Sequence, residues 1–269
     1  MLLNDLRLYL RLIGIQIRSQ LQYKANLLVD IVTYFCVTGL EFLTLFLYFA
    51  QFPVMGGWHV GEVALLYSVT SIGFGLAELF GAGIDSFDEI IRRGDFDRVL
   101  LRPVTALVQI ASNEFRLRRL GRITQGILSS LLALFLLHGL RWTALKALVL
   151  VFGFISSAII FDSILLMGAT ICFWSVETTE ITNILYYGGR EMLSYPITIY
   201  HQLLQRLLLF VVPLAFGSYL PVCYLLDRPL PFGFSPAVVL LSPLVALAFG
   251  GVSLWIWGYG VRHYQSTGS

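Results

Sequence analysis

Six long apolar runs, separated by short polar segments, form the main pattern of the chain. Each run is close to the ~20 residues that an α-helix needs to cross the hydrocarbon core of a bilayer. They cover residues 26–51, 61–84, 120–138, 143–173, 206–226 and 238–260. The pattern predicts an all-α membrane protein with six transmembrane helices, in a domain over residues 25–262 that is followed by a short tail, 263–269.

The residues before the first run show a different, amphipathic pattern. Polar side chains recur at spacings of three, four or seven, and apolar ones follow the same period on another face. The polar set is Asn4, Arg7, Arg11, Arg18 and Gln22. This predicts an amphipathic helix over residues 1–24 that lies in the membrane interface. The alternative is the cytosolic start of the first span, but the polar interruption at residues 24–26 favours a separate element.

The composition agrees with a membrane protein that has little mass outside the bilayer. Hydrophobic residues make up 57% of the chain and charged residues only 13%, against roughly 25% charged in an ordinary soluble domain. The basic residues flank apolar runs and form no separate basic domain, which argues against nucleic-acid binding. Cys36, Cys172 and Cys223 lie far apart without metal-ligand spacing, so we interpret them as packing residues.

The distribution of Lys and Arg predicts the orientation. With the N-terminus inside, fifteen of the 18 basic residues fall in inside segments and only Arg141, Lys146 and Arg228 fall outside. Short loops follow the positive-inside rule well. We therefore expect a multi-pass protein with both termini in the cytoplasm.

Residues 85–122, between the second and third runs, hold eight of the 18 basic residues. Residues 86–93 are acidic early and basic late, which suits a short helix, and Gly94 is a typical helix end. Asp95 then begins a second helix that closes before Pro103. Residues 99–101 are apolar and need cover, either from the membrane and neighbouring helices or from a groove on a soluble partner.

Several kinds of chemistry have no motif here. A GxxxxGK phosphate loop followed by Ser or Thr is missing, so the chain cannot bind ATP in the P-loop way. HExxH, GxSxG and CxxC are missing as well. The sequence therefore predicts no catalytic set, no metal site and no cofactor bound by this chain.

Besides Asp30 and Glu62, which lie nearer the span ends, three carboxylates fall well within the predicted spans, namely Glu41, Glu78 and Asp162. A charge at bilayer depth costs at least ~2.5 kcal/mol on insertion scales, so it usually faces a cavity or a partner. These residues either line a substrate path that favours cationic substrates or are neutralised by packing between helices.

Small residues at spacing four predict close helix packing, within the chain or between subunits. They are Gly73, Ala77 and Gly81, with weaker pairs Gly153/Ser157 and Ala246/Gly250.

Two stretches resemble a known family. Residues 91–103 read IRRGDFDRVLLRP, and a second stretch contains EITN at 180–183, YPITIY at 195–200 and FVVP at 210–213. Together with six spans and an N-terminal amphipathic helix, they resemble the permease subunits of bacterial type-2 ABC exporters, in their six-span branch. The resemblance covers essentially the whole chain.

The resemblance implies a dimer of permeases, identical or paired with a related sister subunit, joined to two ABC ATPase subunits that bind ATP and Mg. It implies a bacterial cytoplasmic membrane and export of a hydrophobic, amphiphilic or cationic compound between the permeases, lined mainly by the first, second and fifth spans. It places ATPase coupling in the cytosolic loop 85–118, at Arg93, Asp95, Phe96, Asp97, Leu100, Arg102 and Pro103.

Two other classes of protein are alternatives. An ion-coupled carrier or channel that acts without an ATPase would use Glu41, Glu78 and Asp162 as proton or cation sites. An intramembrane enzyme would need a convergent set of His, Ser or carboxylate residues, which the sequence does not offer.

Overall fold

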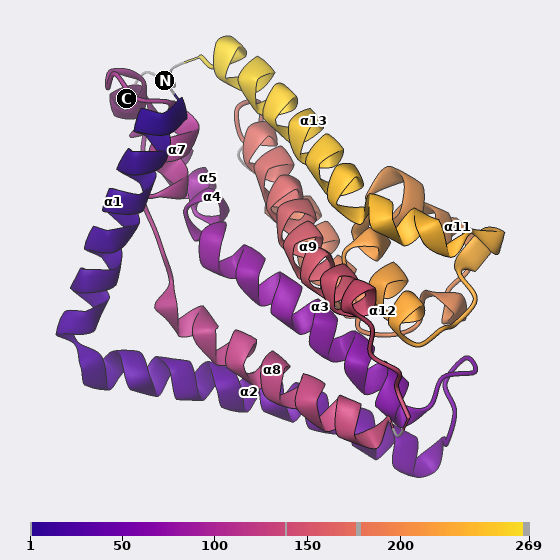
Figure 1. Ribbon diagram of the computed structural model, residues 1–269. Helices are drawn as coiled ribbons and strands as arrows, with labels where there is room; N and C mark the ends of the chain where they lie inside the picture. Colours follow the sequence, from indigo (N-terminus) through magenta and orange to yellow (C-terminus); the bar gives the residue numbers. More distant parts are fainter. Residues whose placement is uncertain (1, 138, 176–178, 266–269) are drawn as a thin grey trace.

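The computed structural model describes residues 2–137, 139–175 and 179–265, and this part of the chain is helical apart from its turns and one isolated β-bridge between Met55 and Trp58 (Figure 1). The all-α prediction is confirmed. The long helices are α1 (Leu2–Gln22), α2 (Lys24–Gln51), α3 (Val60–Phe80), α8 (Leu120–Leu136), α9 (Ala144–Ile171), α10 (Thr179–Leu193) and α13 (Ser242–His263).

Among the described residues, four helices are long and apolar enough to cross a membrane. They are α2, α3, α9 and the stretch Pro236–His263, which contains α13. A bent pair of helices, Gln202–Val211 and Leu214–Leu225, makes a fifth if it is counted as one span. The predicted third span is α8, whose 17 residues make it shorter than these helices.

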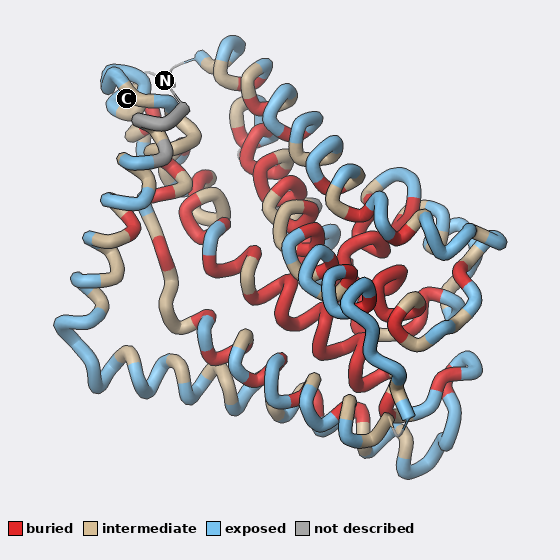
Figure 2. Tube along the Cα trace, viewed as in Figure 1, coloured by how far each residue is buried: buried red, intermediate tan, exposed pale blue. Residues whose placement is uncertain are grey.

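Helix α3 is the centre of the packing, and Figure 2 shows it buried along almost its whole length, while α2 and α13 are largely exposed. Its small residues face neighbouring helices of the same chain. A Cβ atom built on Gly73 would lie 2.4 Å from the Ser157 side chain of α9, and one on Gly81 would lie 2.3 Å from Asp162. The predicted small-residue packing is therefore intrachain.

The helices α9 and α13 pack together through a second row of small residues. Gly250 of α13 lies against Ile159 and Ser163, and a Cβ on Gly260 would lie 2.7 Å from the ring of Phe173. Ala246 is fully buried in the same row. The predicted Ala246/Gly250 pair thus lets α13 approach α9 closely.

The predicted fifth span, 206–226, is not a continuous helix. The chain bends by 76° between Gln202–Val211 and Leu214–Leu225. Pro213 causes the break, because proline has no N–H to donate and its ring disfavours helix in the preceding residue. The segment consists of α11 (Gln202–Arg206), the π-helical turn η3 (Leu207–Val211), the 3₁₀ turn η4 (Leu214–Phe216) and α12 (Tyr219–Leu225).

Both ends of this bent segment lie at the same end of the helix bundle. Just before it, Ile199 touches Gly56 in the turn between α2 and α3. Just after it, Arg228 binds Glu62 at the start of α3, at 2.6 Å, and the carbonyl oxygen of Gly57. Residues 206–226 therefore enter the bundle and return to the same end. The prediction that they cross the membrane as one straight helix was wrong.

Helix α10 runs along α3 and α9, although its sequence is mixed polar and aromatic. Near its start Thr182 packs on Gly168, and at its end the Leu193 carbonyl accepts a hydrogen bond from Thr70 of α3 at 3.0 Å. Tyr186 is buried between Phe74 and Phe161. These contacts place α10 inside the bundle rather than in a polar loop.

The N-terminal segment forms the helix α1, which meets α2 at a sharp corner next to Tyr23 (Figure 1). Its position in the membrane interface stays a prediction. Its Ile13 is buried against Leu79 and Phe115. At the other end of the chain, α13 extends to His263, and residues 266–269 of the predicted tail lie outside the described residues.

Candidate functional site

The cytosolic loop predicted from the sequence folds into four short helices. Its helices are α4 (Ala82–Asp85), α5 (Phe87–Arg92), α6 (Phe96–Leu100) and α7 (Ala106–Ala111). Gly94 separates α5 from α6 and has a φ of 70°. A residue with a side chain would be strained in this backbone conformation. The N–H groups of Gly94 and Asp95 donate to the carbonyls of Ile91 and Ile90, so the end of α5 is capped as predicted.

Aromatic rings fill the base of the loop. Phe87 and Phe96 have no exposed surface and lie 5.4 Å apart. They contact rings from the ends of α9 and α13 that lie beside the loop, namely Phe173, Trp257 and Tyr264, at 4.8–5.4 Å. Edge-to-face pairs of this kind add to the stabilisation from burial, so α5 and α6 are held firmly to the span ends.

The outer surface of α6 and the turn after it is exposed. Leu101 is 85% exposed and Leu100 43%. Of the seven predicted coupling residues, six lie on or near this surface, namely Arg93, Asp95, Asp97, Leu100, Arg102 and Pro103. Phe96 is buried, so in this conformation it supports the loop from within, and any part it has in ATPase contact is indirect.

The second half of the loop is tied back by Arg116. Its guanidinium binds Glu114 at 2.6 Å and Asp85 at 3.1 Å. The hydrogen bonds to Glu114 outweigh desolvation and raise the pKa of Arg116 above its ordinary value. Burial would raise the pKa of Glu114, but the hydrogen bond and charge of Arg116 overcome it and lower the pKa below its usual range. Arg116 therefore holds the second half of the loop, at Glu114, against Asp85 at its start.

A buried ion triad joins the end of α3 to the start of α8. Glu78 lies 2.6 Å from Arg119 and 3.0 Å from Arg122, and all three side chains are buried. Glu78 stood out in the sequence as a charge within a predicted span, whereas neither arginine was singled out. Their spacing of three on one helix face, opposite an unpaired carboxylate, is the signal that could have found the triad.

Glu41 of α2 is shared among residues from three helices. Its carboxylate lies 2.5 Å from Arg190 of α10, 3.3 Å from the Tyr67 hydroxyl of α3 and 4.0 Å from Arg122. Arg190 is buried and also pairs with Glu191, whereas the Glu41 side chain is 38% exposed. Arginines thus neutralise Glu41 and Glu78. That these two carboxylates line a substrate path stays a prediction.

Asp162 lies apart from this network. Its Oδ1 is buried beside Gly81 and accepts no hydrogen bond from the residues that the structure describes. The structure therefore brings Glu41 and Glu78 into one network with the arginines, but not Asp162. Its role in the path also stays a prediction.

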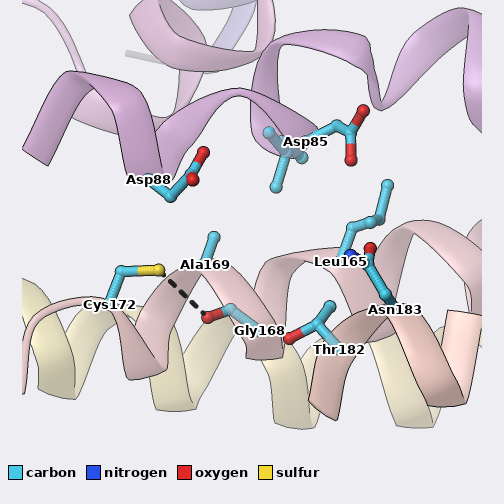
Figure 3. Close-up of a pocket in the computed structure, with 9 residues that line it drawn as sticks. Asp85, Asp88, Leu165, Gly168, Ala169, Cys172, Thr182 and Asn183 are labelled. Atoms are coloured by element: carbon cyan, nitrogen blue, oxygen red, sulfur yellow. Dashed lines mark hydrogen bonds between the residues drawn. The ribbon is translucent and has the colours of Figure 1, made fainter. Parts of the chain in front are cut away.

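A small cavity lies at the end of the bundle next to the loop, between α4–α5 and α9–α10. Figure 3 shows Asp85 and Asp88 on one side of the cavity and Thr182 and Asn183 on the other. The Cys172 thiol donates a hydrogen bond to the Gly168 carbonyl. Within the described residues, no group of three or more His, Cys, Asp or Glu side chains could hold a metal ion.

Comparison with known proteins identifies the family. Curated proteins and solved structures gave no significant match. In contrast, residues 35–268 match the family described as ABC-2 family transporter protein, which is most of the chain and includes both the loop and the ion network. The chain therefore belongs to the ABC-2 family of transporter proteins, whose members are typically non-catalytic membrane permeases.

Proposed function

We propose that this chain is the membrane-spanning permease subunit of an ATP-driven exporter. Two permeases, identical or a sister pair, work with two ATPase subunits that bind ATP and Mg. The proposal is supported by the family, because ABC-2 permeases work with ATPase subunits, and by the missing phosphate loop. The chain itself then has no catalytic residue.

The observation that carries this proposal is the exposed surface of α6. Leu100 and Leu101 are apolar, exposed and flanked by Arg98 and Arg102 on a loop outside the spans. Covering one leucine on docking is worth about 1.5–3 kcal/mol. A surface of this kind, held on a rigid aromatic base, suits a groove on a soluble partner.

Co-purification with the ATPase tests the docking surface. The triple variant Asp97→Ala, Leu100→Ala, Arg102→Ala should insert normally but lose ATPase binding and stimulation of ATP hydrolysis. A matched control, Leu10→Ala with Arg11→Ala, removes an exposed leucine and arginine from α1 and should keep both. Unchanged binding by the triple variant would show that the docking surface is elsewhere.

We further propose six crossings, formed by α2, α3, α8, α9, α10 and α13, with both termini in the bacterial cytoplasm. Support for α10 as the fifth crossing comes from its path from Gly168, near the cytosolic end of α9, toward Ile199, which touches Gly56 at the other end. The 17 residues of α8 give about 25 Å of helix, slightly less than the ~30 Å hydrocarbon core.

Cysteine labelling on intact cells tests this topology. In a Cys36→Ser background, which removes the exposed native cysteine, Thr198→Cys should react with an impermeant maleimide from outside. Arg92→Cys should react only after permeabilisation. If Thr198→Cys also needs permeabilisation, residues 174–205 are cytosolic and α10 is not a crossing.

We place the substrate path between α2 and α10. Asn183, Tyr187 and Glu191 are exposed at spacing four on α10, and Glu41 is partly exposed on α2. Polar side chains exposed on a membrane helix usually face a water-filled path or a partner. The proposed substrate is a hydrophobic, amphiphilic or cationic compound. The double variant Glu41→Gln, Glu78→Gln tests the path: if the range of transported compounds is unchanged, both residues serve only in packing.

One observation favours the alternative of an ion-coupled carrier acting alone. The Oδ1 of Asp162 has no hydrogen-bond partner in the part of the chain that the structure describes, and carriers use such carboxyls as proton sites. Transport by the purified chain in liposomes without any ATPase, abolished by Asp162→Asn, would decide for the carrier.

A further inference from the structure

The aromatic cluster under the cytosolic loop joins three parts of the chain that are distant in sequence. Phe87 and Phe96 come from the loop, Phe173 follows α9, and Trp257 and Tyr264 come from the end of α13. Phe87 touches Trp257 at 5.1 Å and Phe96 touches Tyr264 at 4.8 Å, while Phe173 lies within 5.7 Å of all the others. Each buried ring covers roughly 150–250 Å², so the loop and the two span ends share one apolar core.

The later half of the loop is attached to α1 in a different way. Thr105 donates to Asp5 at 2.7 Å, Gln16 donates to the Asn113 carbonyl at 2.9 Å, and the Leu117 N–H donates to Gln20 at 3.0 Å. Polar bonds near the surface exchange with water at little net cost, whereas separating buried rings exposes apolar area. Phe115 of the later half also packs on Ile13 of α1. The first half of the loop is therefore bound to α9 and α13 through a core of buried rings, and the later half is bound to α1 through hydrogen bonds and a smaller apolar cluster.

The attachment to α9 and α13 continues along the membrane. Trp257 and Gly260 begin the row of small and buried residues that holds α13 against α9, and Gly250 and Ala246 extend it toward the other end. Close packing transmits displacement because interiors have few voids. A displacement of α6 is thus passed first to α9 and α13, before α1 and α2.

We propose that this aromatic cluster is the joint that couples the ATPase to the spans, and that Phe96 is its central positioning residue. The inference rests on the proposed function of the chain. Loop helices α5–α6 and the cytosolic ends of α9 and α13 move as one body when the ATPases close, while α1 shifts relative to that body. The Phe96 ring does not contact the ATPase but fixes the angle at which α6 presents Leu100 and Arg102.

Distances between spin labels test the shared movement. Labels at Arg92→Cys on α5, Arg262→Cys on α13 and Arg11→Cys on α1 occupy exposed positions, in the Cys36→Ser background. In lipid nanodiscs with the bound ATPase, trapping with ATP and vanadate should leave the 92–262 distance unchanged and shift the 92–11 distance. A 92–262 shift as large as the 92–11 shift would overturn the inference.

Replacement of the central ring tests the joint itself. In the fraction of the protein that is bound to the ATPase, Phe96→Leu should broaden the 92–262 distance distribution and lose the nucleotide-dependent shift in the 92–11 distance. The control Phe161→Leu removes an equally buried ring from the membrane core and should keep both distances. Tyr264→Leu, at the partly exposed edge of the cluster, provides a milder variant should Phe96→Leu fail to fold.

The outcomes separate the two proposals. If the unaltered chain does not bind the ATPase, the proposed function fails. If the ATPase binds and both Phe96→Leu and Tyr264→Leu retain the normal distances and shifts, the proposed function stands and the joint is wrong.

Discussion

Replacing Glu78 by glutamine tests whether the buried triad is held together by charge. Glu78→Gln keeps the shape of the side chain but leaves Arg119 and Arg122 buried with no full negative charge between them. The next carboxylate, Glu41, is 4.0 Å from Arg122 and already pairs with Arg190. Removing one partner of a buried ion pair costs about 3–5 kcal/mol, because the remaining charge is uncompensated.

The expected loss is large enough to measure by thermal unfolding. One kcal/mol shifts the melting temperature by about 2–4 °C in chains of 150–250 residues, so Glu78→Gln should melt roughly 6–20 °C below the unaltered protein. Tryptophan fluorescence of the protein in lipid nanodiscs reports the transition, and the chain has five tryptophans to follow.

Two further variants show whether charge is the cause. Glu191→Gln makes the same chemical change at a carboxylate that is 58% exposed and should cost less than about 1 kcal/mol. The apolar triple variant Glu78→Leu, Arg119→Met, Arg122→Met should recover most of the loss, because well-packed apolar residues often replace a buried ion group without cost. If Glu78→Gln melts like the unaltered protein, or the triple variant is no better, the reasoning is refuted.

Three other perturbations have defined outcomes in the same melting assay. Gly121→Ala places a Cβ 2.2 Å from a backbone carbonyl of α2 and should cost about 1–3 kcal/mol, whereas Gly39→Ala, which has open space, should be neutral or stabilising. Arg228→Lys loses the two-pronged bond to its glutamate and should cost about 1–3 kcal/mol. The lowered pKa of Glu114 contributes stability that is full above its unfolded pKa of about 4.3 and is lost as pH falls through the folded pKa. Glu114→Gln should therefore flatten the part of the melting profile that lies below about pH 4.3.

Local signals were sufficient to predict α1, α2, α3, α8, α9, α13 and the short loop helices α5 and α6. Gly94 and Pro103 act on the backbone next to them, so the two short loop helices could be placed from the sequence. The course of the chain over residues 182–226 could not be predicted, because hydropathy reports the composition of a segment and not its direction. Residues 206–226 are apolar but bend at Pro213, while α10 carries Arg190 and Glu191 and resembles a loop until their ion pairs are known.

The sequence predicted the carboxylates of the candidate site but not the arginines that pair with them. Glu41 and Glu78 stand out because a charge within an apolar run is costly. Their partners do not, since Arg190 lies 149 residues from Glu41 in sequence and no local pattern joins them. Phe96 belongs to a recognisable motif, but only the fold shows that its ring points inward.

The central position of α3 has a consequence for how the protein is made. Thr70 and Glu78 find their partners in Leu193 and in the two arginines at the start of α8, all of which are synthesised later than α3. During translation α3 thus enters the membrane with polar groups that α2 alone cannot satisfy. Its insertion is completed only when later helices arrive, so a ribosome that stalls before α8 leaves a segment suited to capture by membrane quality control.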